Sequence, residues 1–228
     1  MVLVAVIGLI FAASLGLLLA LKRAHAGAAA MMAGTTVRRS ADPLMPDENV
    51  KDLKLPAFTL RDQDGKTIDN SVFTGHVTIV DFFFTHCKLV CPALTQHMAD
   101  QQRALKETTA RMLSVSVDSE HDTPGTLKAY AAEHGADPSR WTFACGDRQM
   151  IGAIVEGGMK FAVGDDPNPA RVIDLAGGKK MNNIVHPSWF VLVGPKGEVL
   201  GVYLAEVDED MAALTERAQV AAGRVERK

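Results

Sequence analysis

Hydrophobic residues along the chain gather into short runs separated by polar segments rich in glycine, proline and aspartate. The run at residues 77–84 holds valine, isoleucine and phenylalanine with a single charged residue, which predicts a buried central strand. Residues 112–117 alternate around two serines and predict a second buried strand. Similar runs predict further strands at residues 141–144, 188–193 and 198–203.

Helical spacing of apolar residues fills the intervals between these strands. It predicts helices at residues 93–106, 124–133 and 147–155, and a last helix from residue 208 onward. Thr123 is the expected N-cap of the second helix, with Pro124 at its first position. Residues 159–183 are predicted to be an insertion carrying a hairpin, and the chain from Glu216 onward to be solvated.

The turn sequence Asp64-Gly65 lies between two short strand patterns and predicts a β-hairpin ahead of the central strand. Strand, helix, strand, helix, then a strand pair and a final helix is the order of a thioredoxin-like α/β fold. We therefore predict that fold, with an N-terminal β-hairpin extension and an inserted hairpin. In this fold the turn after residue 84 lies at the carboxyl end of a central strand, where α/β sheets place their sites.

The N-terminus forms a separate segment. Val2 to Leu21 is an unbroken apolar stretch long enough to cross a bilayer, and Lys22-Arg23 ends it. We predict one transmembrane helix at residues 1–23, acting as a membrane anchor or an uncleaved signal, followed by a flexible linker at residues 24–49. Residues 50–228 then form one domain of ordinary size.

Composition narrows the classes of function. The 228-residue chain has a formal net charge of −3, which gives no electrostatic basis for nucleic-acid binding. Its three cysteines are too few for a disulfide scaffold. Cys145 stands alone beside apolar residues and is predicted to be a buried small residue.

Cys87 and Cys91 follow the central strand, and Pro92 marks the start of the next helix. The helix N-terminus and the neighbouring Lys88 both favour thiolate over thiol. Two soft thiolates on a short turn suit copper(I) or a reversible disulfide. A static disulfide, or two buried thiols, is the structural alternative.

His186 directly precedes Pro187, in a loop that faces the cysteine turn in a thioredoxin-like fold. Proline pushes the preceding residue toward an extended backbone, which aims the imidazole outward. His186 is therefore the candidate third ligand beside Cys87 and Cys91, and an ordinary surface or hydrogen-bonded histidine is the alternative. His86 is the rival imidazole, but we expect it to point away from a site that its neighbour Cys87 enters.

Three motifs follow one another along the chain between residues 84 and 197. Residues 84–92 read FTHCKLVCP, residues 116–124 read SVDSEHDTP, and His186 is followed by Pro195-Lys196-Gly197. They resemble the F-T-x-C-x-x-x-C-P, S-V-D-P-x-x-D-T-P and H-S…P-x-G signatures of the Sco/SenC family, which are copper chaperones for cytochrome c oxidase assembly. The resemblance covers roughly residues 50–210. The departures are Lys88-Leu89 for Pro-Asp, Ser119 for proline and Pro187 for serine.

This resemblance implies a domain that binds copper, as copper(I) or copper(II), through positions Cys87, Cys91 and His186. It implies delivery of copper to the binuclear copper centre of the oxidase, or reduction of that centre's thiols, rather than enzymatic turnover. The implied partners are the copper-bearing subunit of cytochrome c oxidase and a copper donor protein. The protein is then membrane-anchored, with its globular domain exported to the periplasmic side of a bacterial inner membrane. Asp118 is expected to cap a turn, or to support a metal ligand through a hydrogen bond, rather than to bind metal itself.

The alternative function is enzymatic: a thiol-disulfide oxidoreductase of thioredoxin-like type, in which one of Cys87 and Cys91 attacks and the other resolves. Pro187 fits this alternative if it is a cis-proline opposite the cysteines. The C-x-x-x-C spacing argues against it, since such enzymes favour C-x-x-C and do not need His186. A peroxidase is disfavoured because the turn lacks a proline and a correctly spaced threonine ahead of Cys87. A domain with only a structural role has no need of both thiols beside a helix start.

Overall fold

The structure is a computed structural model that describes residues 39–88, 91–168 and 170–227. The predicted membrane anchor at residues 1–23 lies outside the described residues, as does most of the predicted linker, residues 24–38. Within the described part of the chain, no helix combines the length and the hydrophobicity needed to span a bilayer.

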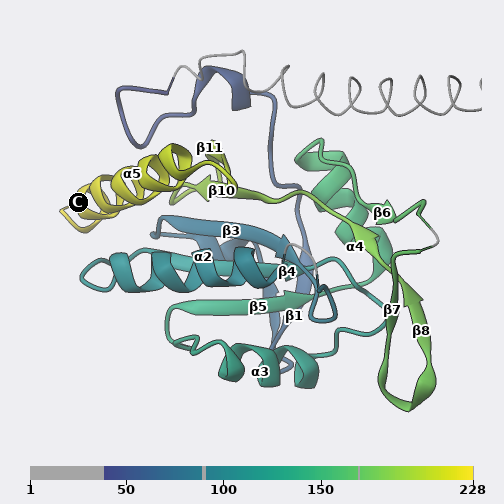
Figure 1. Cartoon of the computed structure of the whole chain (residues 1–228). Helices are drawn as coiled ribbons and strands as arrows, with labels where there is room; N and C mark the ends of the chain where they lie inside the picture. Colours follow the sequence, from purple (N-terminus) through teal and green to yellow (C-terminus); the bar gives the residue numbers. More distant parts are fainter. Residues whose placement is uncertain (1–38, 89–90, 169, 228) are drawn as a thin grey trace, which may run out of the picture. The chain divides into compact units, whose positions relative to one another are not determined.

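A mixed sheet of seven strands forms the centre of the domain (Figure 1). From one edge to the other, its strands are β11 (Val199–Leu204), β10 (Trp189–Val193), β3 (Thr78–Phe83), β4 (Arg111–Ser116), β5 (Trp141–Cys145), β1 (Thr59–Asp62) and β2 (Thr67–Asp69). β3, β4 and β5 are parallel, whereas β10 pairs antiparallel with both β3 and β11. The predicted order, parallel crossovers first and an antiparallel pair last, is confirmed. The predicted N-terminal hairpin is β1 and β2, which extends the sheet because β1 also pairs with β5.

The described residues form four α-helices: α2 (Cys91–Ala104), α3 (Pro124–Glu133), α4 (Arg148–Gly152) and α5 (Asp208–Glu226). Short helical turns add η1 (Glu48–Val50), η2 (Asn70–Phe73), η4 (Ala176–Gly178) and the π-helical η3 (Ala153–Gly158), which continues α4. α2 lies between α3 and α5 (Figure 1). Its Thr95 hydroxyl lies 2.7 Å from the Tyr130 hydroxyl of α3. Its Gln101 side chain accepts a hydrogen bond from Thr215 of α5.

The C-terminal helix is longer than the sequence predicts. α5 extends to Glu226, and its alanines Ala218, Ala221 and Ala222 are fully buried. The prediction of a solvated end from Glu216 onward is wrong, because these small side chains form a buried stripe on the helix. Alanine also has the highest helix propensity, so this stretch stays helical nearly to the end of the chain.

The insertion after η3 forms two small two-stranded sheets. β7 (Val172–Asp174) pairs with β8 (Lys180–Asn182) as the predicted hairpin, and β6 (Gly164–Asp165) pairs with β9 (Ile184–Val185). Figure 1 shows the β7–β8 hairpin projecting from the body of the domain. β9 ends at Val185, so the insertion delivers His186 to the main sheet just before β10.

Residues 39–49, which the sequence analysis places in the flexible linker, pack against the domain instead. The compact unit begins at Arg39 rather than at residue 50. Asp47 is fully buried, and its amide donates to the Leu200 carbonyl of β11. Its carboxylate pairs with Arg217 of α5 at 2.7 Å. This segment therefore covers the backbone of an edge strand, which would otherwise present unpaired carbonyl groups.

Candidate metal centre

The cysteine turn (residues 84–88) follows directly from the buried strand β3. The Cys87 amide donates to the Phe84 carbonyl at 3.2 Å, which closes a tight turn at the end of the strand. Cys91 is the first residue of α2 and Pro92 the second, where proline costs no helical hydrogen bond. Strand end and helix start thus hold the two thiols close together at the carboxyl end of the parallel strands.

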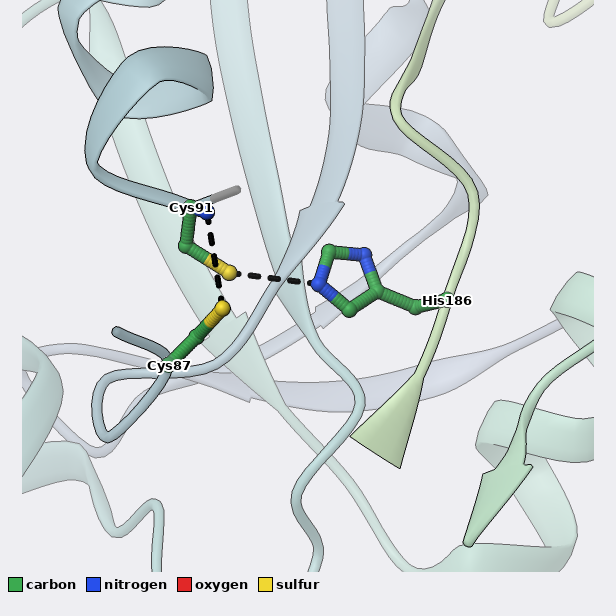
Figure 2. Close-up of side chains that lie close together, drawn as sticks. All are labelled: Cys87, Cys91 and His186. Carbon is green, nitrogen blue, oxygen red and sulfur yellow. Dashed lines mark hydrogen bonds between the residues drawn. The ribbon is translucent and has the colours of Figure 1, made fainter. Parts of the chain in front are cut away.

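Figure 2 shows Cys87, Cys91 and His186 pointing toward one another from the cysteine turn, from α2 and from the segment before β10. The Cys91 sulfur lies 3.2 Å from Nε2 of His186. The Cys91 amide donates to the Cys87 sulfur at 3.4 Å. All three ligand atoms lie within 4.8 Å of one another, and no disulfide joins the described cysteines. The fold therefore brings together the three residues that the sequence analysis selects.

Hydrogen bonding fixes which nitrogen of His186 faces the sulfur. Nδ1 lies 3.1 Å from the Pro187 carbonyl, and a carbonyl can only accept, so Nδ1 carries the proton of the neutral ring. Nε2 then presents its lone pair toward Cys91. A backbone carbonyl on the far ring nitrogen is a usual support for a metal-binding imidazole. The Phe84 ring packs edge-on against the imidazole, with 5.6 Å between centroids.

Burial controls the state of the Cys91 thiol. Cys91 is fully buried, and Cys87 is 7% exposed. Burial is the largest of the causes that raise the pKa of the Cys91 thiol far above its ordinary value, followed by the hydrogen bond and the charge of Cys87. The prediction that the helix terminus favours a thiolate is therefore wrong for Cys91. Desolvation of a buried thiolate outweighs the partial charge at a helix N-terminus.

The donor set fits a copper ion. Thiolate sulfur is a soft ligand that selects copper(I), and imidazole suits copper in either oxidation state. A metal that binds Cys91 must displace the thiol proton, and the positive charge of the metal then offsets the cost of burying the thiolate. Cys87, Cys91 and His186 can therefore hold copper in a site that excludes most competing water.

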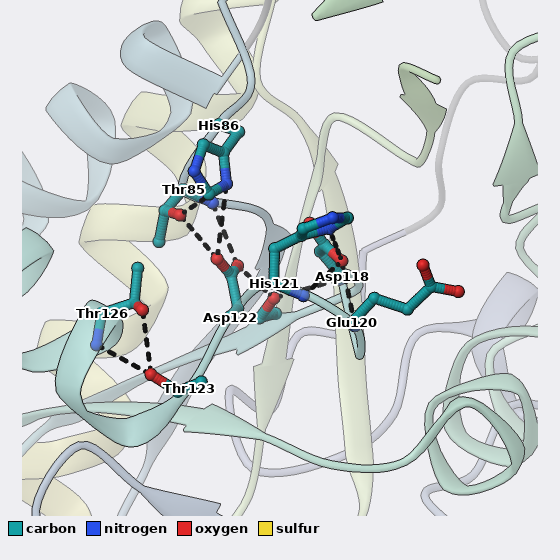
Figure 3. A network of polar contacts seen from close by, with 9 residues as sticks. Thr85, His86, Asp118, Glu120, His121, Asp122, Thr123 and Thr126 are labelled. Atoms are coloured by element: carbon teal, nitrogen blue, oxygen red, sulfur yellow. Dashed lines mark hydrogen bonds and ion pairs between the residues drawn. The ribbon is translucent and has the colours of Figure 1, made fainter. Parts of the chain in front are cut away.

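A buried carboxylate fastens the cysteine turn to the loop between β4 and α3 (Figure 3). Asp122 accepts hydrogen bonds from the Thr85 amide at 3.0 Å and from the Thr85 hydroxyl at 2.5 Å. It also accepts from the Ser116 hydroxyl at 2.5 Å. Asp122 thus connects the end of β4 with the residue that lies two positions before Cys87.

His86, Asp118 and Asp122 form a second group whose ligand atoms lie within 4.8 Å of one another. The carboxylate oxygens of this group already have hydrogen-bond partners. Asp118 accepts hydrogen bonds from the amides of Glu120 and His121, and its Oδ2 atom lies 2.9 Å from Nδ1 of His121. The predicted turn-capping role of Asp118 is confirmed. In this network the His86 ring packs edge-on against the His121 ring, with 6.0 Å between the ring centroids. His86 therefore points away from the cysteine site, as predicted.

The insertion forms one wall of the candidate metal centre. One shallow pocket is lined by Cys87 and His186 together with Asp166, Arg171 and Asn183 of the insertion. A second pocket adjoins the exposed Lys88 and is lined by residues 170–174 and Asn183. Cys145 lies apart at the end of β5 and is buried as predicted.

Two carboxylates near the cysteines were not selected from the sequence. Asp122 carried a signal, since it directly precedes the helix cap Thr123 within the second motif. Asp81 also carried one, as the only charged residue in the apolar run of β3. Neither signal shows from sequence alone that the carboxylate is fully buried beside the thiols.

These observations define a class of protein: a mixed α/β domain that presents two thiols and an imidazole at the carboxyl end of its parallel strands. Residues 46–220 match the family model SCO1/SenC, and the chain belongs to that family. It is 36% identical over 148 residues to the SCO1 protein homolog of Bacillus subtilis, covering 64% of this chain and 71% of the relative.

Solved structures of Sco proteins share the fold. A SCO1/SenC family lipoprotein from Bacillus anthracis superposes with a TM-score of 0.62 at 26% identity, covering 75% of this chain and 96% of that one. BsSco, a Sco family member with a disulfide switch, superposes with a TM-score of 0.60 at 30% identity, covering 76% of this chain and 95% of that one. The copper-bound ScoI of Bradyrhizobium japonicum superposes with a TM-score of 0.57 at 23% identity, covering 76% of this chain and 98% of that one. At this identity the likeness shows only that the two chains share a fold.

Proposed function

We propose that this protein is a membrane-anchored copper metallochaperone that serves the assembly of cytochrome c oxidase. It delivers copper to the copper centre of the oxidase or maintains the thiols of that centre. The observation that carries the proposal is the convergence of Cys87, Cys91 and His186 within 4.8 Å at a buried turn. The family membership supports the same reading, because BsSco belongs to the Sco family of cytochrome c oxidase assembly proteins.

Copper is cargo in this proposal, and the site suits transfer. Three donors leave a coordination position through which a partner's ligand can reach the metal. The pocket beside Cys87 and His186 marks where such a ligand approaches, and the charged residues Asp166 and Arg171 border it. The copper-bearing subunit of the oxidase and a copper donor protein are the partners that this arrangement serves.

The anchor is proposed from residues 1–23, whose apolar stretch has the length of a membrane span. The exported position of the domain is supported by the Bacillus anthracis relative, which is a lipoprotein. Separation of cell membranes from the soluble fraction, with protease added to intact spheroplasts, tests both points. We expect the protein in the membrane fraction with its domain open to digestion.

The deciding experiment is the copper(I) stoichiometry of the reduced full chain, compared between the parent, His186→Ala and His86→Ala. We expect one tightly held copper(I) per parent chain. His186→Ala is expected to weaken binding at least about tenfold, the smallest loss seen when only a supporting residue of a metal site is removed. His86→Ala is the matched control and is expected to bind copper(I) like the parent, because His86 faces Asp122 and His121. Absence of stable copper in the parent would exclude the metallochaperone.

A second candidate function is thiol-disulfide exchange, and one contact favours it. The Cys91 amide donates to the Cys87 sulfur, which stabilises a thiolate on Cys87 and suits it to attack a disulfide. Cys91 would then resolve the mixed disulfide. The predicted support from a cis-proline is wrong, because residues 39–88, 91–168 and 170–227 contain no cis peptide bond and Pro187 is therefore trans.

Redox titration separates the two candidates. An oxidoreductase requires rapid cycling of a Cys87–Cys91 disulfide with a thiol substrate, and it loses nothing when His186 becomes alanine. A metallochaperone requires His186 and holds copper(I) under reducing conditions. Rapid cycling with no copper(I) bound would make the oxidoreductase the function of this site.

A further inference from the structure

His86, Asp118 and Asp122 lie next to the candidate metal centre but take no part in it (Figure 3). One ligand atom from each of these residues lies within 4.8 Å of the other two, which is the same closeness that joins the three donors of the cysteine site. Nδ1 of His86 lies 4.0 Å from Oδ1 of Asp122. Two metal–ligand bonds of about 2.0–2.2 Å span such a distance, so one ion can contact both atoms.

The two carboxylates of this group keep unused capacity to accept. Among the described residues, Oδ1 of Asp122 accepts a hydrogen bond only from the Thr85 hydroxyl, and Oδ2 of Asp118 is contacted only by Nδ1 of His121. Each carboxylate oxygen has about two lone pairs, so each of these two oxygens retains one for a further ligand. The turn-capping bonds of Asp118 go to its other oxygen, Oδ1, and remain in place.

The group also holds two enclosed negative charges close together. The side chains of Asp118 and Asp122 are 3% and 0% exposed, and in the described part of the chain no arginine or lysine forms an ion pair with either. Their ion-pair contacts there are the imidazoles of His86 and His121, which are charged only when protonated. A divalent cation between the two carboxylates offsets their repulsion and the cost of burying them.

An ion can reach this group from solvent. A pocket of about 300 Å³ is lined by Asp118 and His121, and another of about 450 Å³ is lined by Asp122. The His86 side chain is 33% exposed. Water molecules can therefore complete the coordination of an ion that three protein ligands hold.

His121 supports Asp118 rather than binding the ion. Its Nδ1 atom lies 3.0 Å and 2.9 Å from the two oxygens of Asp118. An ionised carboxylate can only accept, so Nδ1 carries a proton and the hydrogen bond orients the carboxylate. Ligating carboxylates are usually held by such a second hydrogen bond.

We propose that His86, Asp118 and Asp122 form a second metal site, which takes a divalent ion that accepts both nitrogen and oxygen ligands, such as Zn²⁺. The chemistry of this site differs from that of the cysteine site, because thiolates select copper(I) whereas imidazole and carboxylate together suit zinc. An ion bound there joins the residue before Cys87 to the loop between β4 and α3. The inference goes beyond the proposed function and does not depend on copper.

The first test measures Zn²⁺ binding by calorimetry to the full chain carrying Cys87→Ser, Cys91→Ser and His186→Ala. These three changes remove the cysteine site, whose ligands also bind Zn²⁺. We expect one Zn²⁺ per chain. Adding His86→Ala or Asp118→Asn should weaken binding at least about tenfold, since even a supporting residue of a metal site is worth that much.

His97→Ala is the matched control, because His97 is a half-buried histidine of α2 that packs against Phe190 instead. Added to the same chain, it should leave Zn²⁺ binding unchanged. Asp118→Asn keeps an oxygen for the amides of Glu120 and His121, so it removes the charge and preserves the turn. Thermal unfolding checks that each variant is folded, and Zn²⁺ should raise the melting temperature only where the second site is intact.

Chemical modification tests the site in the otherwise unaltered chain. With reduced thiols and enough Zn²⁺ to fill both sites, His86 should react more slowly with diethyl pyrocarbonate, and His97 at an unchanged rate, as read by peptide mass spectrometry. Asp118→Asn should abolish this protection, which zinc bound to the cysteines alone does not explain. A folded chain without the cysteine site that binds no Zn²⁺, an equal loss of affinity in His97→Ala, or unchanged modification of His86 would overturn the second site.

Discussion

Beneath the cysteine turn, three acidic groups have raised pKa values, and burial is the largest cause for each. They are Asp81, Cys91 and Asp122. Favourable partners lie nearby, such as the hydroxyls of Ser114 and Ser116, but their effect is smaller than the desolvation. At the scale of single residues, desolvation therefore favours the protonated form of each of these three groups.

Asp81 should make the stability of the protein fall as pH rises. Its pKa is raised from 3.8 to about 7 in the folded state, so the folded chain holds a proton that the unfolded chain has lost between these values. The free energy of unfolding therefore decreases through this window and reaches the full penalty above pH 7. The penalty is on the order of 4 kcal/mol as an upper bound, from about 1.4 kcal/mol for each unit of pKa.

Asp81→Asn removes this dependence. We expect the variant to gain stability relative to the parent as pH rises from about 4 to 8, measured by urea unfolding of the full chain at several pH values. Asp122 is common to both proteins, so its own titration cancels. A stability difference that stays constant with pH would show that the pKa of Asp81 is the same in the folded and the unfolded chain.

At the scale of elements, the hydrophobic pattern predicted most of the fold. β3 was predictable because a strand buried on both faces gives a continuous apolar run, and α3 because Thr123 and Pro124 mark its start. The packing of residues 39–49 was not, because its polar and proline-containing sequence is typical of a linker. Its order comes from ion pairs to α5, more than 160 residues away in the chain.

The same contrast, between local sequence patterns and contacts to distant residues, explains which parts of the candidate metal centre were predictable. The two thiols were predictable from their position between β3 and a helix start, whereas His186 was preferred to His86 mainly because its spacing matches the Sco/SenC signature. The support of the cysteine turn was not predictable, because Asp122 reaches Thr85 across 37 positions. The ionisation of Cys91 was wrongly predicted for a related reason: the sequence shows the helix start, whereas burial depends on the whole fold.

Asp122 should be essential to the order of the cysteine turn. Asp122→Ala leaves the Thr85 amide and the hydroxyls of Thr85 and Ser116 without their acceptor. We expect a loss of about 2–4 kcal/mol in the free energy of unfolding, on the scale of buried donors left unpaired. Copper(I) affinity should also fall, because the turn that carries Cys87 loses its attachment to the β4–α3 loop.

Thr123→Ala is the matched control for this prediction. It removes the adjacent N-cap of α3, whose hydroxyl accepts from the Thr126 amide, and should cost about 1 kcal/mol. It touches no residue of the cysteine turn, so copper(I) affinity should stay at the parent value. A competition titration with a copper(I) chelator measures both variants, and equal affinity losses would mean that Asp122 acts only through general stability.

At the scale of the whole molecule, the ends of the described chain hold each other in place. Arg217 of α5 donates to Asp47, and its guanidinium also donates to the carbonyls of Pro43 and Met45. The Asp47 side chain is fully enclosed, and only 7% of the Arg217 side chain is exposed. Arg39 adds a second cation on Asp47 and lies 3.9 Å above the centroid of the Tyr203 ring.

Because the Asp47–Arg217 ion pair is buried, removing one of its partners should cost far more stability than removing one partner of a surface ion pair. Asp47→Ala leaves Arg217 charged and enclosed, and we expect a loss of about 3–5 kcal/mol in the free energy of unfolding of the full chain. Arg39→Gln is the control: its side chain is 23% exposed, so the loss should stay near about 1 kcal/mol. The double variant Asp47→Ala/Arg217→Met should recover part of the stability, since no charge is then left buried. If the double variant is instead as unstable as the sum of its single changes, the segment at residues 39–49 is held by its backbone contact with β11 rather than by the ion pair.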